Sequence, residues 1–112
     1  MPEDIADTPA AAKTGRLYVS LMRLTDKGLA ELAGSPNRRK ISEERVAALG
    51  GKSVAFYATL GAYDFVQVFE MPDNEAMMQY VLTARRDGFV EPLILPAFDP
   101  PTFGDIVERV LK

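Results

Sequence analysis

Hydroxyl and amide side chains alternate with apolar residues along three segments of the chain. They are Tyr18, Ser20, Tyr57, Thr59 and Gln67. Alternate residues of a β-strand point to the same side of a sheet, so these five side chains are predicted to share one sheet face. There they could orient a small polar or aromatic ligand. They could equally form the polar part of an interface between two copies of the chain.

Tyr63 and Asp64 form a second candidate, at the end of the short segment 61–64. A phenol beside a carboxylate could donate and accept a proton at the mouth of a pocket. The same residue types also suit a tight turn, in which Gly61 takes a positive φ and Asp64 accepts backbone N–H groups. Two basic runs, 38–40 and 85–86, are expected on solvated helix faces, with an anion-binding patch as the alternative.

Composition restricts the chemistry that the chain could perform. Its 112 residues include no cysteine and no histidine, and the net charge is −3. Thiolate metal sites and disulfides are therefore excluded, and general acid–base work would fall to tyrosine, carboxylate or lysine. We expect no metal site and no nucleic-acid partner, because neutralising a phosphate backbone requires a basic surface. Haem and flavin remain open, since either can bind without histidine.

The chain is about one domain long. Residues 1–15 are predicted to be a flexible tail, and residues 16–112 to form the domain. The start of the chain lacks the basic and apolar segments of a secretory signal, and no stretch has the roughly 20 apolar residues of a membrane helix. The sequence therefore predicts a soluble cytoplasmic protein without a membrane partner.

Apolar periodicity and helix-start signals predict four strands and four helices. The strands span 17–24, 54–60, 65–71 and 89–97, and the helices 29–33, 36–49, 74–87 and 102–111. Segment 61–64 joins the second and third strands as a hairpin. Pro92 and Pro96 each lack a backbone N–H, so the fourth strand is expected at an edge or a bulge. The order predicts a ferredoxin-like α+β fold, βαββαβ plus a C-terminal helix, with an antiparallel four-stranded sheet.

Such a sheet has helices on one face and leaves the other face open. The uniformly apolar set is predicted to lie beneath the helices: Val19, Leu21, Val54, Phe56, Ala58, Val66 and Val68. The mixed aromatic and polar set is predicted on the open face: Tyr18, Ser20, Met22, Ala55, Tyr57, Thr59, Phe65, Gln67 and Phe69. An open face with four aromatic residues favours a two-fold dimer, although a ligand or another protein could also cover it.

Several blocks of the sequence resemble the GYD-domain family. They lie at 18–25 with Gly28 following, 35–36, 49–52 and 57–64, the last containing T-L-G-A-Y-D, with Pro72-Asp73 further on. The resemblance spans about residues 18–110. It implies membership of the dimeric α+β-barrel superfamily, in a family whose members are mostly of unknown function.

Three classes of function are compatible with these observations. The first is a homo-oligomeric protein that binds a small molecule or a partner protein through the sheet face between subunits. The second is a cofactor-free enzyme, resembling the monooxygenases and isomerases of this fold, with its pocket between subunits. The third is an assembly subunit of a larger complex, docked through its tail and C-terminal helix. The ligand-binding candidates in all three are Tyr18, Ser20, Tyr57, Thr59, Tyr63, Asp64 and Gln67.

Overall fold

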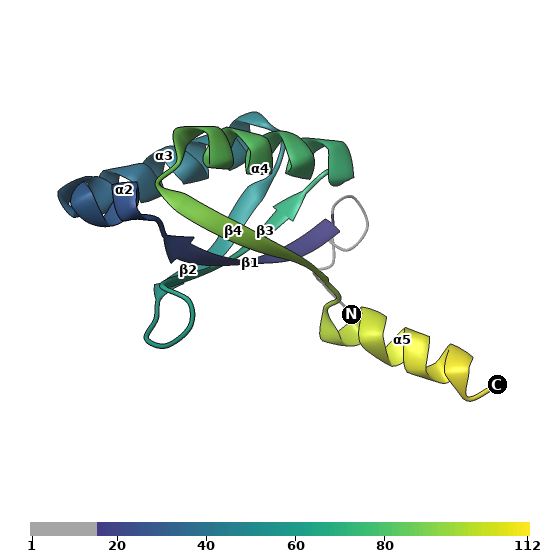
Figure 1. The fold of residues 1–112 in the computed structure, drawn as a ribbon. Coiled ribbons are helices and arrows are strands. Elements are labelled where there is room, and N and C mark those ends of the chain that lie inside the picture. The colour runs from purple at the N-terminus through teal and green to yellow at the C-terminus, as the bar shows by residue number, and fades with distance from the viewer. Residues whose placement is uncertain (1–15) are drawn as a thin grey trace.

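A computed structural model describes residues 16–112; the predicted tail, 1–15, lies outside the described residues. The elements are, in order, β1 (Arg16–Leu24), α2 (Asp26–Ala30), the 3₁₀ helix η1 (Leu32–Gly34), α3 (Ser35–Ala48), β2 (Lys52–Ala58), β3 (Phe65–Met71), α4 (Asn74–Asp87), β4 (Val90–Ala97) and α5 (Pro100–Val110). The four strands form one antiparallel sheet in the order β2-β3-β1-β4. Helices α3 and α4 lie on one side of this sheet (Figure 1). The predicted α+β, ferredoxin-like fold is confirmed.

Local sequence signals explain most element boundaries. Asp73 caps α4 by accepting a hydrogen bond from the backbone N–H of Ala76, and Gly88 ends the helix with φ 79°. Gly50, at φ 86°, ends α3 in the same left-handed conformation, which glycine adopts without a steric penalty. Strand β4, which carries both prolines, lies at an edge of the sheet as predicted.

The start of α3 differs from the sequence-based expectation. The helix was expected to begin at residue 36, but Ser35 is already its first helical residue, and the cap residue Gly34 offers no side chain. The reason is that η1 runs directly into α3, so the chain is already helical at this point. The Ser35 hydroxyl accepts a hydrogen bond from the Arg38 guanidinium.

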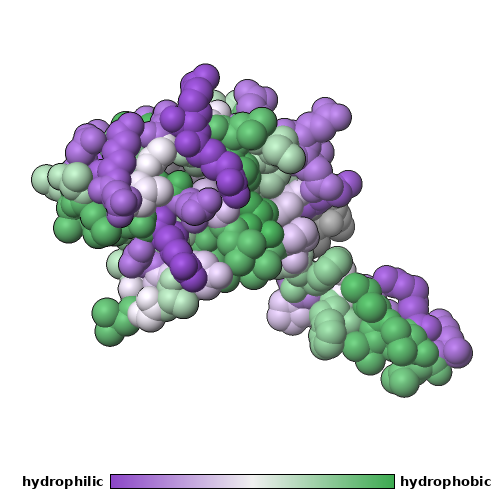
Figure 2. Space-filling model, in the orientation of Figure 1, coloured by the Kyte–Doolittle hydropathy of each residue, from purple (hydrophilic) through white to green (hydrophobic). Residues whose placement is uncertain are grey.

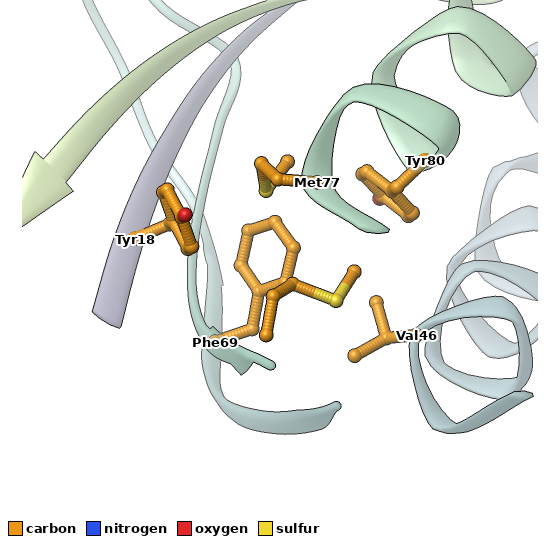
Figure 3. Close-up of a cluster of buried hydrophobic side chains, with 6 residues drawn as sticks. Tyr18, Val46, Phe69, Met77 and Tyr80 are labelled. Carbon is orange, nitrogen blue, oxygen red and sulfur yellow. The ribbon is translucent and has the colours of Figure 1, made fainter. Parts of the chain in front are cut away.

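Large aromatic and methionine side chains form a core in one part of the layer between the sheet and the helices (Figure 3). Phe69 from β3 lies among Tyr18 from β1, Val46 from α3, and Met77 and Tyr80 from α4. The Tyr18 hydroxyl donates a hydrogen bond to the side-chain oxygen of Asn74, so its polar end is satisfied. The core therefore lies on one side of the sheet only.

This core shows that the prediction of the two sheet faces was wrong for β1 and β3. Tyr18, Ser20, Met22, Gln67 and Phe69 were expected on the open face, yet all five are buried on the face that carries the helices. The longer side chains of β1 and β3 lie beneath the two helices, whereas the smaller branched residues lie on the opposite face. Uniform apolarity was therefore a poor guide to which face the helices cover.

On β2 the prediction was correct for Phe56 and Ala58 beneath the helices and for Ala55 and Tyr57 on the open face, but these residues were grouped with the wrong residues of β1 and β3. The register between β2 and β3 shifts between Ser53 and Ala55, as at a β-bulge, which inserts one residue and exchanges the faces. Beyond the shift, Phe56 pairs with Gln67 on the helix-covered face, whereas Tyr57 pairs with Val66 on the open face. Period-two sorting from the sequence cannot detect such an insertion.

Candidate functional site

The hairpin between β2 and β3 is held to the sheet by Asp64. Its carboxylate accepts a hydrogen bond from the backbone N–H of Leu24 at 2.8 Å, and its own N–H donates to the Met22 carbonyl at 2.8 Å. Thr59 closes the turn, because its hydroxyl donates to the Tyr63 carbonyl at 2.7 Å. Gly61 has φ 101°, the positive value predicted for this turn. These contacts give Asp64 and Thr59 a structural role.

Tyr63 packs beneath a cation rather than beside a free carboxylate. The Arg23 guanidinium carbon lies 5.1 Å from the centre of the Tyr63 ring, a cation–π arrangement. The carboxylate of Asp64 is meanwhile oriented toward the backbone of β1. The hypothesis of a Tyr63–Asp64 proton-transfer pair therefore gains no support from the geometry of the turn.

The structure separates the seven predicted ligand-binding residues into three groups. Tyr18, Ser20 and Gln67 lie beneath the helices. Tyr57 lies on the opposite face and is 65% exposed. The remaining three, Thr59, Tyr63 and Asp64, belong to the hairpin. A single pocket containing all seven is therefore ruled out, and a ligand-binding role for any one of them stays a prediction.

The face of the sheet opposite the helices is apolar in its middle and carries charged residues toward its ends, where Arg23 pairs with Glu91 and Glu70 pairs with Leu17 and Lys52. We use the name open sheet face for its apolar part: Leu17, Val19, Leu21, Ala55, Tyr57, Val66, Val68, Leu93, Leu95 and Ala97. Leu93 and Leu95 on β4 are 46% and 42% exposed. No helix within residues 16–112 covers this face.

Helix α5 is the second uncovered apolar element. It leaves the end of β4 and extends away from the sheet (Figure 1), which accounts for the elongated dimensions of 52 × 29 × 22 Å. None of residues 100–110 is buried, and Phe103 and Val110 are 61% and 75% exposed. Figure 2 shows apolar atoms gathered along this helix. A helix with this pattern normally packs its apolar side against another surface.

A cavity of about 600 Å³ lies between α3, α4 and the helix-covered face of the sheet. Its apolar walls are formed by Met22, Leu24, Ile41, Phe56, Phe65, Ala84, Phe89 and Val90. Gln67 reaches it from β3, and three arginines reach it from α3: Arg38, Arg39 and Arg45. Ser35, Ser42, Tyr80 and Asp87 complete its polar lining. We call this space the helix–sheet cavity.

Polar contacts link the two helices along this cavity. The hydroxyl groups of Ser42 and Tyr80 are 2.5 Å apart, and the Arg45 guanidinium lies 2.6 Å from the Asp87 carboxylate. Burial raises the pKa of the Tyr80 phenol, with the Ser42 hydrogen bond and the charge of Arg45 acting in the opposite direction. The neutral phenol is therefore the form that the fold stabilises.

The arginines were the residues that sequence reasoning undervalued. Arg38 and Arg39 were expected on a solvated helix face, with anion binding only as the alternative. The seven-residue spacing between Arg38 and Arg45 was the available signal, since it places both side chains on one side of α3. Among residues 16–112, no group of three acidic, histidine or cysteine side chains is arranged to hold a metal ion.

Comparison with known proteins assigns this arrangement to a family. The GYD domain model matches residues 18–107. The chain belongs to the GYD domain family. The matched part of this GYD protein contains nearly all of the sheet, both covering helices, the helix–sheet cavity and most of α5. The resemblance inferred from the sequence blocks is thereby confirmed.

A relative from the bacterium Thermus thermophilus is 35% identical to this GYD protein over 94 residues. The matched region covers 83% of this chain and 96% of the relative. The relative is named a glutamine synthetase and cystathionine beta-lyase binding protein. Within residues 16–112, no helix of the GYD protein has both the length and the apolar content needed to cross a bilayer.

Proposed function

We propose that this chain is a non-enzymatic binding protein, which forms a homodimer through its open sheet face and docks onto a partner enzyme through α5. The observation that carries the proposal is that one small domain exposes two separate apolar surfaces, while a relative of nearly the same length is named for the enzymes it binds. Glutamine synthetase and cystathionine β-lyase are accordingly the first partners to test.

The open sheet face suits a second copy of the chain. It is broad, and its central strand presents Leu17, Val19 and Leu21 in succession. Two such faces related by a two-fold axis bury each other's apolar side chains, and two-fold dimers are the commonest oligomers. Contiguous apolar patches of this kind are unusual on monomers. The predicted dimer therefore keeps its place in the proposal, although with a different set of residues at the interface.

Helix α5 suits a groove on a different protein. Its apolar side carries Phe103, Val107 and Val110 at the three- and four-residue spacing of helix-in-groove recognition. Asp99 caps the helix, because its side chain accepts a hydrogen bond from the Thr102 N–H at 2.9 Å. A capped helix that already projects from the domain loses less conformational entropy on docking than a disordered segment would.

Binding to the two enzymes, prepared from the organism that makes this chain, tests the proposal. We expect surface plasmon resonance to detect binding to at least one enzyme, and the double variant Phe103→Gln with Val110→Gln to weaken it at least about tenfold, since buried apolar anchors dominate such interfaces. Glu108→Gln, on the polar side of α5, is the matched control and should bind like the wild type. Failure to bind either enzyme, or equal binding by the double variant, would contradict the proposal.

The cofactor-free enzyme has less support, because the carboxylate of Asp64 is engaged by the Leu24 N–H and the Tyr63 ring by Arg23.

The assembly-subunit alternative differs from the proposal only in the permanence of the complex. Stable co-purification of the chain with an enzyme subunit would favour it. A cytoplasmic location stays a prediction from the sequence.

A further inference from the structure

The helix–sheet cavity has the properties of a ligand site and is separate from the open sheet face and from α5. Its volume of about 600 Å³ lies in the range of small-molecule pockets, roughly 300–1,000 Å³. Aromatic rings dominate one wall, where the centres of the Phe56 and Phe65 rings are 5.4 Å apart. A flat aromatic group could pack against these rings.

An unsatisfied polar atom lies at the sheet side of the cavity. Gln67 is 1% exposed, and its Nε2 donates to the Ser53 hydroxyl at 3.3 Å. Its Oε1 has no hydrogen-bond partner among residues 16–112, and neither has the hydroxyl oxygen of Ser20, the residue that pairs with Gln67 across β1 and β3. A buried acceptor left in this state is costly, and such groups call for a specific explanation. A hydrogen-bond donor on a bound ligand would supply the missing partner.

The helix side of the cavity is positively charged, although the whole chain carries a net charge of −3. Three arginines line it, against the single carboxylate of Asp87. The guanidinium carbons of Arg38 and Arg39 lie 4.1 and 5.6 Å from the centres of the Phe89 and Phe56 rings. Arg45 pairs with Asp87, Arg39 pairs with Glu43, and Arg38 donates hydrogen bonds to the Glu31 carbonyl and the Ser35 hydroxyl. The guanidiniums are thus supported by aromatic rings at the border of the apolar walls, where a carboxylate could form charge-assisted hydrogen bonds.

We propose that the helix–sheet cavity binds a small aromatic carboxylic acid that carries a hydrogen-bond donor. Its carboxylate lies at Arg38 and Arg39, its ring packs against Phe56 and Phe65, and its donor group reaches Oε1 of Gln67. The carboxylate is recognised by α3, whereas the ring and the donor group are both recognised by the paired strands β2 and β3.

The test is isothermal titration calorimetry with matched probes on the full chain. We expect 3-(4-hydroxyphenyl)propionate to bind more tightly than 3-phenylpropionate, which lacks the donor, and at least about tenfold more tightly than 3-(4-hydroxyphenyl)propanamide, which lacks the charge. Equal binding of acid and amide, or no binding of the hydroxylated acid at millimolar concentration, would overturn the proposal.

Variants locate the binding within the cavity. Arg39→Met should weaken the acid at least about tenfold, whereas Arg86→Met, on α4 outside the cavity lining, should leave it unchanged. Gln67→Leu conserves volume and should abolish the advantage of the hydroxylated acid over 3-phenylpropionate. Circular dichroism checks that each variant is folded, and Gln67→Met, which also removes the amide oxygen, repeats the test at position 67 if Gln67→Leu is not folded. An unchanged affinity in Arg39→Met, or a hydroxyl advantage that survives in the folded position-67 variant, would place the acid elsewhere, for example on the open sheet face, and refute the assignment.

Discussion

Tyr80 joins α4 to α3 through its hydroxyl contact with Ser42, and burial raises the pKa of its phenol. At pH values below the ordinary tyrosine pKa of 10.0, the phenol is neutral in both the folded and the unfolded chain. The contribution of the neutral phenol to the free energy of unfolding is then fully present. At higher pH the unfolded chain releases this proton first. The free energy of unfolding therefore falls as pH rises from about 10 through the folded pKa, by up to about 1.4 kcal/mol per pH unit.

Tyr80→Phe should remove this contribution to the fall in the free energy of unfolding at alkaline pH. At neutral pH we expect the variant to be about 1 kcal/mol less stable, because the hydrogen bond with Ser42 is lost. Urea unfolding at neutral pH and above pH 10 measures both effects. Tyr57→Phe, at the exposed ring on the open sheet face, is the control and should follow the wild type. An alkaline slope shared by all three proteins would show that Tyr80 does not cause it.

The local backbone conformation of the hairpin was predicted more reliably than the surroundings of Gln67. The turn chemistry of Gly61 was predicted, because glycine at a tight turn reflects local backbone geometry. The surroundings of Gln67 were not, because they depend on which face the helices cover and on a register shift at Ser53. Local conformation is encoded in a few neighbouring residues, whereas burial is decided by contacts between distant segments.

At the scale of the elements, Gly51 and Gly104 differ in the space available for a side chain. Gly51, between α3 and β2, could not accept a side chain without strain, since an added Cβ would lie 2.3 Å from the Glu70 carbonyl oxygen and 2.8 Å from the Met71 sulfur. Gly104, within α5, has nothing within 4 Å of the same position.

Gly51→Ala should therefore lower the free energy of unfolding by about 1–3 kcal/mol, the usual cost of overpacking. Gly104→Ala should instead increase the helical circular dichroism signal, because alanine favours a helix interior over glycine by about 1 kcal/mol. Both variants are compared with the wild type at equal protein concentration, since association affects apparent stability. A neutral Gly51→Ala would indicate that β2 can move away from α3.

Element positions followed from the sequence because their signals are local. Strand β3 and helix α4 have the predicted ends, 65–71 and 74–87, set by a hairpin turn before β3, a capping Asp73 and a final Gly88. The first helix spans Asp26–Ala30 rather than the predicted 29–33. Helix α3 begins one residue before the predicted residue 36, because η1 precedes it without a break.

At the scale of the whole molecule, the sheet and α5 each have an apolar side that no other element among residues 16–112 covers. The helix-covered face has a core of aromatic and methionine side chains, while apolar residues of the open sheet face and of α5 remain exposed. Figure 2 shows the apolar side of α5. The sequence predicted that one face would need a partner, because two helices cannot cover both sides of a sheet. It misassigned that face because the aromatic residues were taken as the sign of an interface, whereas their size suits the space beneath the helices.

The mass of the full chain in solution is the most direct test of the open sheet face as an interface. Light scattering coupled to size exclusion should give twice the 12.3 kDa of one chain at micromolar concentration. Val19→Glu, which places a charge on the central strand of that face, should dissociate the dimer, whereas Gln79→Glu, on the exposed side of α4, should leave it intact. A wild-type mass of 12.3 kDa, or a dimer unaffected by Val19→Glu, would contradict a homodimer formed through this face.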